Sequence, residues 1–126
     1  MGDLRILVVD DFNTMQRIIG NILHEIGYTK LVFANDGEKA FKILLKEKID
    51  LVISDWSMPH MTGIELLRKV RVDPGLAHMK FIMVTAEGEK TRIIEAVNGK
   101  VDQYIIKPFS ADTLKEKINA VFKEGS

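Results

Sequence analysis

Three aspartates in this sequence each follow a short apolar run. Asp10 and Asp11 come directly after residues 6–9, and Asp55 comes directly after residues 51–54. Runs of this length that contain β-branched residues predict buried strands, and open α/β sheets bind ligands at the carboxyl ends of their strands. Carboxylates that meet there can hold a hard cation, and one of them can accept a phosphoryl group. The pattern predicts that Asp55 is the phosphoacceptor.

Two other polar side chains follow apolar runs in the same way. Thr85 follows residues 81–84, and Lys107 follows residues 104–106. A threonine hydroxyl can donate a hydrogen bond to a phosphoryl oxygen, and a lysine ammonium is a compact counter-charge for it. The spacing therefore predicts that both side chains serve a phosphoryl group on Asp55.

Three carboxylates brought together repel one another. At a separation of about 4 Å and an effective dielectric constant of about 20, each pair costs about 4 kcal/mol. Such a cluster needs a cation or a bound proton. Hard oxygen ligands with room for water favour Mg²⁺ over zinc. The sequence therefore predicts Mg²⁺ as the cofactor, bound near Asp10, Asp11 and Asp55.

The elements that must position these groups alternate between strand and helix patterns. Short apolar runs predict strands at residues 5–9, 31–34, 51–54, 81–84 and 103–106. Apolar residues at helical spacing predict helices at about 14–26, 38–47, 62–72, 89–97 and 110–123. Five such units predict an α/β fold, with a five-stranded parallel sheet and helices on both faces.

Two details of the predicted helices concern their ends and their inward faces. Asn13 is expected to cap the first helix and Gly27 to end it. In the fourth helix, Ile93, Ile94 and Val97 are expected to face inward.

Length and composition limit the class of protein. The 126 residues are enough for one domain, expected to span residues 1–126. Basic and acidic residues number 18 each, which argues against a nucleic-acid binder, because such proteins carry a basic excess. The chain has no cysteine, no signal-peptide pattern and no apolar run long enough to span a membrane. We expect a soluble, cytoplasmic monomer.

The motifs together resemble the receiver domains of bacterial response regulators. The resemblance covers almost the whole chain and is carried by Asp10-Asp11-Phe12, Asp55-Trp56, Met58-Pro59, Thr85-Ala86-Glu87 and Lys107-Pro108-Phe109. It is strongest to the single-domain chemotaxis regulators (CheY-like). It implies a flavodoxin-like sheet with strand order 2-1-3-4-5 and a cis peptide bond between Lys107 and Pro108.

The resemblance also implies the reaction and its metal site. A histidine kinase would transfer a phosphoryl group to Asp55. Mg²⁺ would be held by Asp11, by Asp10 largely through water, by Asp55 itself and by the backbone carbonyl of Ser57.

Other residues receive roles from the same resemblance. Thr85 and Lys107 would contact the phosphoryl group, and Tyr104 would change rotamer on activation. Ser57 and Glu87 would flank the path of the water that removes the phosphoryl group. Ser57 stands where the chemotaxis relatives most often have asparagine.

The resemblance implies a signalling switch rather than a conventional enzyme, with intrinsic autophosphorylation and autodephosphorylation. The face formed by the fourth helix, fifth strand and fifth helix would control a partner such as a flagellar motor switch protein, and a phosphatase is a possible further partner.

Other functions remain open. The protein could pass phosphate to a histidine phosphotransferase in a relay. It could be a magnesium-dependent phosphatase with an aspartyl nucleophile, although Ser57 occupies the place of the second aspartate. A flavin carrier is disfavoured, because Asp10 and Asp11 would repel the FMN phosphate.

Overall fold

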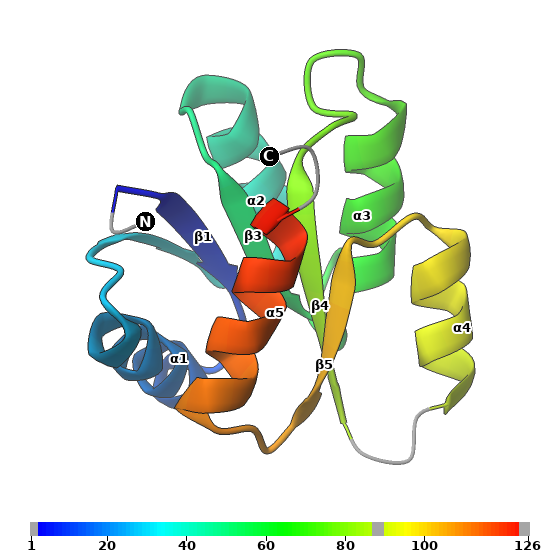
Figure 1. The fold of residues 1–126 in the computed structure, drawn as a ribbon. Coiled ribbons are helices and arrows are strands. Elements are labelled where there is room, and N and C mark those ends of the chain that lie inside the picture. The colour runs from blue at the N-terminus through cyan, green and yellow to red at the C-terminus, as the bar shows by residue number, and fades with distance from the viewer. Residues whose placement is uncertain (1–2, 87–89, 124–126) are drawn as a thin grey trace.

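Five parallel strands form one sheet with helices on both faces in the computed structural model, which describes residues 3–86 and 90–123 (Figure 1). The strands are β1 (Arg5–Val9), β2 (Lys30–Ala34), β3 (Leu51–Asp55), β4 (Lys80–Ala86) and β5 (Gln103–Lys107). The helices are α1 (Asn13–Ile26), α2 (Gly37–Lys46), α3 (Gly63–Val72), α4 (Lys90–Asn98) and α5 (Ala111–Lys123). The strand order is β2-β1-β3-β4-β5. The predicted fold class and the strand order 2-1-3-4-5 are therefore confirmed.

Side chains of the central strands alternate between two cores, one on each face of the sheet. From β1, Leu7 and Val9 point into the core beneath α2, α3 and α4. Ile6 and Val8 point into the core beneath α1 and α5 (Figure 1). Burial on both faces explains why these strands are almost continuously apolar. None of the helices in the described ranges is both long and apolar enough to cross a membrane.

The start of α1 differs from the prediction. Asn13 is the first helical residue, and Phe12 occupies the N-cap position without a side-chain cap. The Phe12 carbonyl accepts the backbone N–H of Gln16 at 3.0 Å, which begins the helix one residue earlier than the Asn13 cap requires. The expected end is confirmed. Gly27 follows the helix with φ of 119°, in the left-handed region that favours glycine.

The predicted inward face of α4 is also wrong in part. Ile94 and Val97 are 60% and 57% exposed, whereas Ala96 is buried against the sheet. Successive helical residues are rotated by about 100°, so Ile94 lies on nearly the opposite side of the helix from Ala96. The side chain of Ile93 is outside the described part of the structure. Sequence periodicity over nine residues did not distinguish these two rotations of the helix.

Three strands extend farther at their carboxyl ends than predicted, β3 to Asp55, β4 to Ala86 and β5 to Lys107. The pairing of β4 with β5 continues through Thr85 opposite Ile106 and Ala86 opposite Lys107. Thr85 and Lys107 therefore lie in the last residues of their strands rather than after them. The backbone of a strand end paired to its neighbour positions these side chains more firmly than a loop would.

The connection from β3 to α3 is held at the start of the helix. Thr62 and Glu65 form a reciprocal capping box, with the Thr62 hydroxyl accepting the Glu65 N–H and the Glu65 carboxylate accepting the Thr62 N–H. Between them, the Gly63 N–H donates to the Trp56 carbonyl oxygen at 2.8 Å. This bond brings the helix backbone against the end of β3.

We predict that Gly63→Ala is strongly destabilising. A methyl group there would meet the Asp55 carbonyl oxygen and would lie 2.8 Å from Met83 Sδ, so backbone would have to move. The free energy of unfolding should fall by about 3 kcal/mol. Urea unfolding would measure it, with Gly75→Ala as the matched control, because the nearest atom to a methyl at Gly75 is 3.4 Å away. Equal stability of the two variants would contradict the prediction.

Candidate functional site

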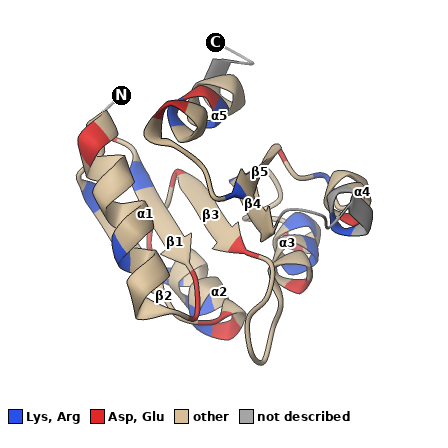
Figure 2. Cartoon of the chain, turned by 90° about the horizontal axis from the view of Figure 1, so that it is seen from below, with Lys and Arg blue, Asp and Glu red and all other residues tan. Residues whose placement is uncertain are grey.

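The strand register brings the predicted site residues to one edge of the sheet. Val9 pairs with Ser54, so Asp10 and Asp55 emerge from neighbouring strands. Asp55 pairs with Val84, the residue before Thr85. Figure 2 shows acidic residues after β1 and at the end of β3, near a basic residue on β5. Residues that are far apart in sequence therefore meet at the carboxyl ends of β1, β3, β4 and β5.

Asp10, Asp11 and Asp55 form the acidic centre of this edge. One carboxylate oxygen from each residue lies within 4.8 Å of the other two. Asp10 is fully buried and Asp55 is 5% exposed. Asp10 Oδ2 and Asp11 Oδ1 are buried and have no hydrogen-bond partner among the described residues. Because unpartnered buried oxygens are costly, this geometry fits a hard divalent cation that takes oxygen ligands.

Burial changes the acidity of two of these carboxyls. It raises the pKa of Asp10 from 3.8 to about 6, against the lowering effect of the Phe12 N–H, which donates to Asp10 Oδ1 at 2.9 Å. Burial also raises the pKa of Asp55, while the Lys107 ammonium lowers it in part. The Lys107 ammonium therefore offsets only part of the effect of burial on these carboxyls, and a bound cation would favour their ionised forms.

Lys107 forms an ion pair with Asp55. Its Nζ lies 3.1 Å from Asp55 Oδ1, and its side chain is 26% exposed. The peptide bond between Lys107 and Pro108 is cis, as the resemblance implied. Strand β5 thus delivers a lysine directly onto the acceptor side chain.

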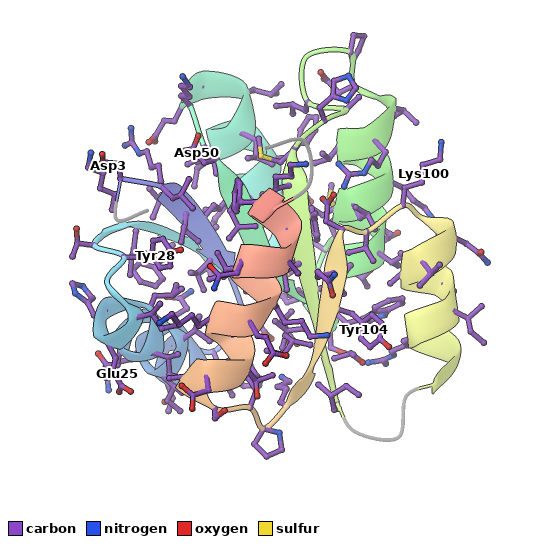
Figure 3. The ribbon with its side chains drawn as sticks, in the orientation of Figure 1. Asp3, Glu25, Tyr28, Asp50, Lys100 and Tyr104 are labelled. Atoms are coloured by element: carbon purple, nitrogen blue, oxygen red, sulfur yellow. The ribbon has the colours of Figure 1, made fainter. Side chains whose placement is uncertain are left out.

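Thr85 and Tyr104 lie on neighbouring strands, at different distances from the edge. Thr85 is the second-last residue of β4, and it is 2% exposed. Tyr104 pairs with Met83 two positions farther from the edge, and it lies between β5 and α4 (Figure 3). The Lys117 ammonium is 5.1 Å from the centroid of the Tyr104 ring. The structure therefore places Thr85 at the same edge of the sheet as the acidic centre and leaves Tyr104 farther from that edge.

Ser57 is exposed at the mouth of the site, and Arg92 contacts it. The Arg92 guanidinium donates to Ser57 Oγ at 3.1 Å and lies over the Trp56 ring, 5.5 Å from its centroid. Glu87, the other residue expected to flank the water path, lies outside the described residues. The roles expected for Ser57 and Glu87 in phosphate loss stay predictions.

Sequence reasoning missed two residues at this edge. Arg92 was one of several charges on a helix face and had no distinguishing signal. Gln16 lies one turn into α1, and its amide donates to the carbonyl oxygens of Asp10 at 2.8 Å and Ala34 at 3.2 Å. These bonds add to the backbone bond from the Asp10 N–H to the Ala34 carbonyl oxygen, and a single glutamine in a helix is too weak a signal to recognise without the fold.

The fold and the site together define a parallel α/β protein with a cluster of carboxylates and a lysine at the carboxyl edge of its sheet. The family model for the response regulator receiver domain matches residues 6–119, and the chain belongs to this family. The resemblance seen in the motifs is therefore confirmed.

Two curated relatives are similar over nearly their full lengths. Chemotaxis protein CheY of Pseudomonas aeruginosa is 48% identical over 120 residues, which cover 95% of this chain and 97% of that protein. Chemotaxis protein CheY-3 of Vibrio cholerae is 46% identical over 121 residues, covering 96% and 93%. Among solved structures, the chemotaxis response regulator CheY4 of Vibrio cholerae superposes with a TM-score of 0.85 at 28% identity, covering 94% of this chain and 98% of that one.

The raised pKa of Asp10 predicts a pH-dependent stability in the absence of metal. A rise from 3.8 to about 6 corresponds to about 3 kcal/mol between the protonated and ionised carboxyl. Because the folded-state pKa lies above the ordinary value, Asp10 supports folding most at about pH 4 and below, and this support is lost as the pH rises through about 6.

We therefore expect Asp10→Asn to raise the free energy of unfolding of the metal-free protein by about 1–3 kcal/mol at pH 7.5. The difference from wild type should shrink as the pH falls below about 6. Urea unfolding in a chelator at pH 5 and pH 7.5 would measure both. A difference that does not depend on pH would show that the charge of Asp10 is not its cause.

Proposed function

We propose that this protein is a phosphorylation-dependent signalling switch, in which Asp55 accepts a phosphoryl group from a histidine kinase. The observation that supports this most directly is the geometry around the acceptor. Asp55 lies within 4.8 Å of two other carboxylates on one side and 3.1 Å from Lys107 on the other. Membership of the receiver domain family supports the same reaction.

Asp10, Asp11 and Asp55 would hold Mg²⁺ together with the backbone carbonyl of Ser57. The unpartnered oxygens of Asp10 and Asp11 support this assignment, because each has a free lone pair for a hard cation. When bound, Mg²⁺ supplies charge neutralisation for the carboxylates and for the phosphoryl oxygens.

The residues of the chain then act mainly by position and charge. An Asp55 carboxylate oxygen attacks phosphorus in line with the leaving nitrogen of the donor phosphohistidine. The new bond is O–P, the broken bond is P–N, and the electron pair stays on the imidazole, which takes up a proton. Lys107 moves its ion pair from the carboxylate to the phosphoryl group, and the Thr85 hydroxyl donates to a phosphoryl oxygen.

The output would be a change at the face formed by α4, β5 and α5. Tyr104 on β5 is the residue expected to change rotamer there, and Lys117 of α5 already contacts its ring. The relatives named chemotaxis proteins, at 46% and 48% identity, favour chemotaxis, with the flagellar motor switch as the downstream partner.

The central test is the site of phosphorylation. Incubated with acetyl phosphate and Mg²⁺, the wild-type protein should gain one phosphoryl group, and Asp55→Asn should gain none, because it lacks the nucleophile. Intact-mass spectrometry would measure this, with a chelator as the metal-free control. Equal phosphoryl incorporation in Asp55→Asn would show that another residue is the acceptor.

Removing Lys107 should separate phosphorylation from its consequence. Lys107→Ala should keep the fold and accept phosphate, because the nucleophile and the acidic cluster remain. It should lose most of the conformational response, because β5 no longer contacts the phosphoryl group. The readout is the set of NMR shifts around Tyr104 with a phosphoryl mimic, and Lys115→Ala, an exposed lysine on α5, is the control. A response of wild-type size in Lys107→Ala would disprove this role.

A further inference from the structure

One side chain connects α4 to the peptide that directly follows the acceptor. Arg92 donates to Ser57 Oγ at 3.1 Å, and its guanidinium carbon is 5.5 Å from the centroid of the Trp56 ring. Trp56 and Ser57 are the first and second residues after Asp55. Arg92 of α4 therefore contacts the side chains of the two residues that directly follow Asp55.

The two residues that Arg92 contacts are held very differently by the rest of the protein. Trp56 is 7% exposed, its N–H donates to the Val84 carbonyl, and its own carbonyl accepts the Gly63 N–H. Ser57 is exposed. Within the described residues, its side chain is joined to another element by the hydrogen bond from Arg92. Trp56 is held by β4 and by the start of α3, whereas the Ser57 side chain is bonded from α4.

Arginine is suited to this double contact. Its planar guanidinium can lie over an indole ring and donate from its edge at the same time. The indole thus orients the guanidinium, and the guanidinium orients the hydroxyl. Through these two contacts, the Trp56 ring and the Arg92 guanidinium together restrain the Ser57 hydroxyl.

We infer that Arg92 is a positioning residue for the reaction at Asp55, which acts through Ser57 and holds the Ser57 carbonyl in place for Mg²⁺. This inference rests on the proposed function, because it needs the metal site. It adds a determinant on α4 that lies outside the acidic centre itself.

The charge of Arg92 and its hydrogen bond to Ser57 have opposite effects on the affinity for Mg²⁺. A guanidinium near the site repels a divalent cation, so Arg92→Ala both loosens Ser57 and removes a repulsion. The affinity of that single variant therefore does not isolate the positioning effect. A double-mutant cycle with Ser57→Ala does, because Ser57→Ala leaves the charge in place.

The experiment measures Mg²⁺ affinity in wild type, Ser57→Ala, Arg92→Ala and the double variant. Trp56 is the single tryptophan of the chain, so its emission reports the titration, and calorimetry gives a second reading. Ser57→Ala should weaken Mg²⁺ binding about fivefold when Arg92 is present, the factor that one hydrogen bond commonly contributes. In the Arg92→Ala background, Ser57→Ala should have no further effect.

Arg68→Ala provides the matched background. Arg68 of α3 pairs with Glu95 of α4 at 3.3 Å, so this variant removes another tie of α4 without touching Ser57. Ser57→Ala should still weaken binding about fivefold in that background. An equal effect of Ser57→Ala with and without Arg92, or no effect in either, would overturn the inference and leave the proposed function intact. A wild-type protein that does not bind Mg²⁺ would instead overturn the proposed function.

Discussion

Repulsion among the three carboxylates at the carboxyl edge of the sheet is the constraint on which the site depends. Asp10 is fully buried, and burial raises its pKa to about 6. Lys107 compensates for one carboxylate, at 3.1 Å from Asp55, and two buried oxygens in the cluster have no partner among the described residues. A protein that keeps charge in this arrangement loses stability at neutral pH until a cation binds. A cation bound there would therefore couple metal binding to folding through the same oxygens.

The scaffold tolerates this cost because the strands beneath the cluster are well buried. Residues 6–9 and 51–53 are fully buried between the two cores. A shift of one residue in the register would turn their apolar side chains to the wrong core and would separate Asp10 from Asp55. The close approach of Gly63 to the end of β3 fixes the other side of the acceptor. Hydrophobic packing of the strands therefore sets the relative positions of the Asp10 and Asp55 side chains.

Helix α4 is attached to this scaffold in a different way. Among its described side chains, Ala96 is buried, whereas Ile94 and Val97 are exposed. Polar contacts supplement that packing, from Arg92 to Ser57 and from Glu95 to Arg68. A helix held by a few polar contacts can change position at smaller energetic cost than one held by a broad apolar face. The site therefore lies between fully buried strands and a helix that reaches it through polar side chains.

Much of this protein follows from the sequence alone, because short-range patterns carry the information. Apolar runs and helical periodicity predicted the alternating elements, and Asp10, Asp11, Asp55, Thr85 and Lys107 were identified because each stands at the end of an apolar run. Parallel strands bring such ends to one edge whatever the details of packing. Membership of the receiver family added the strand order and the cis bond before Pro108, both of which the structure confirms.

Only the tertiary structure decided the features that depend on contacts distant in sequence. The rotation of α4 was set by which of its faces meets the sheet, and a nine-residue pattern with apolar residues on both sides did not specify it. The start of α1 was set by the Phe12 carbonyl and by the loop that Gln16 ties to Asp10 and Ala34, rather than by the cap propensity of Asn13. The contact of Arg92 with Ser57 spans 35 positions. Such a contact exists only once two elements pack side by side, because neither residue carries a local signal for the other.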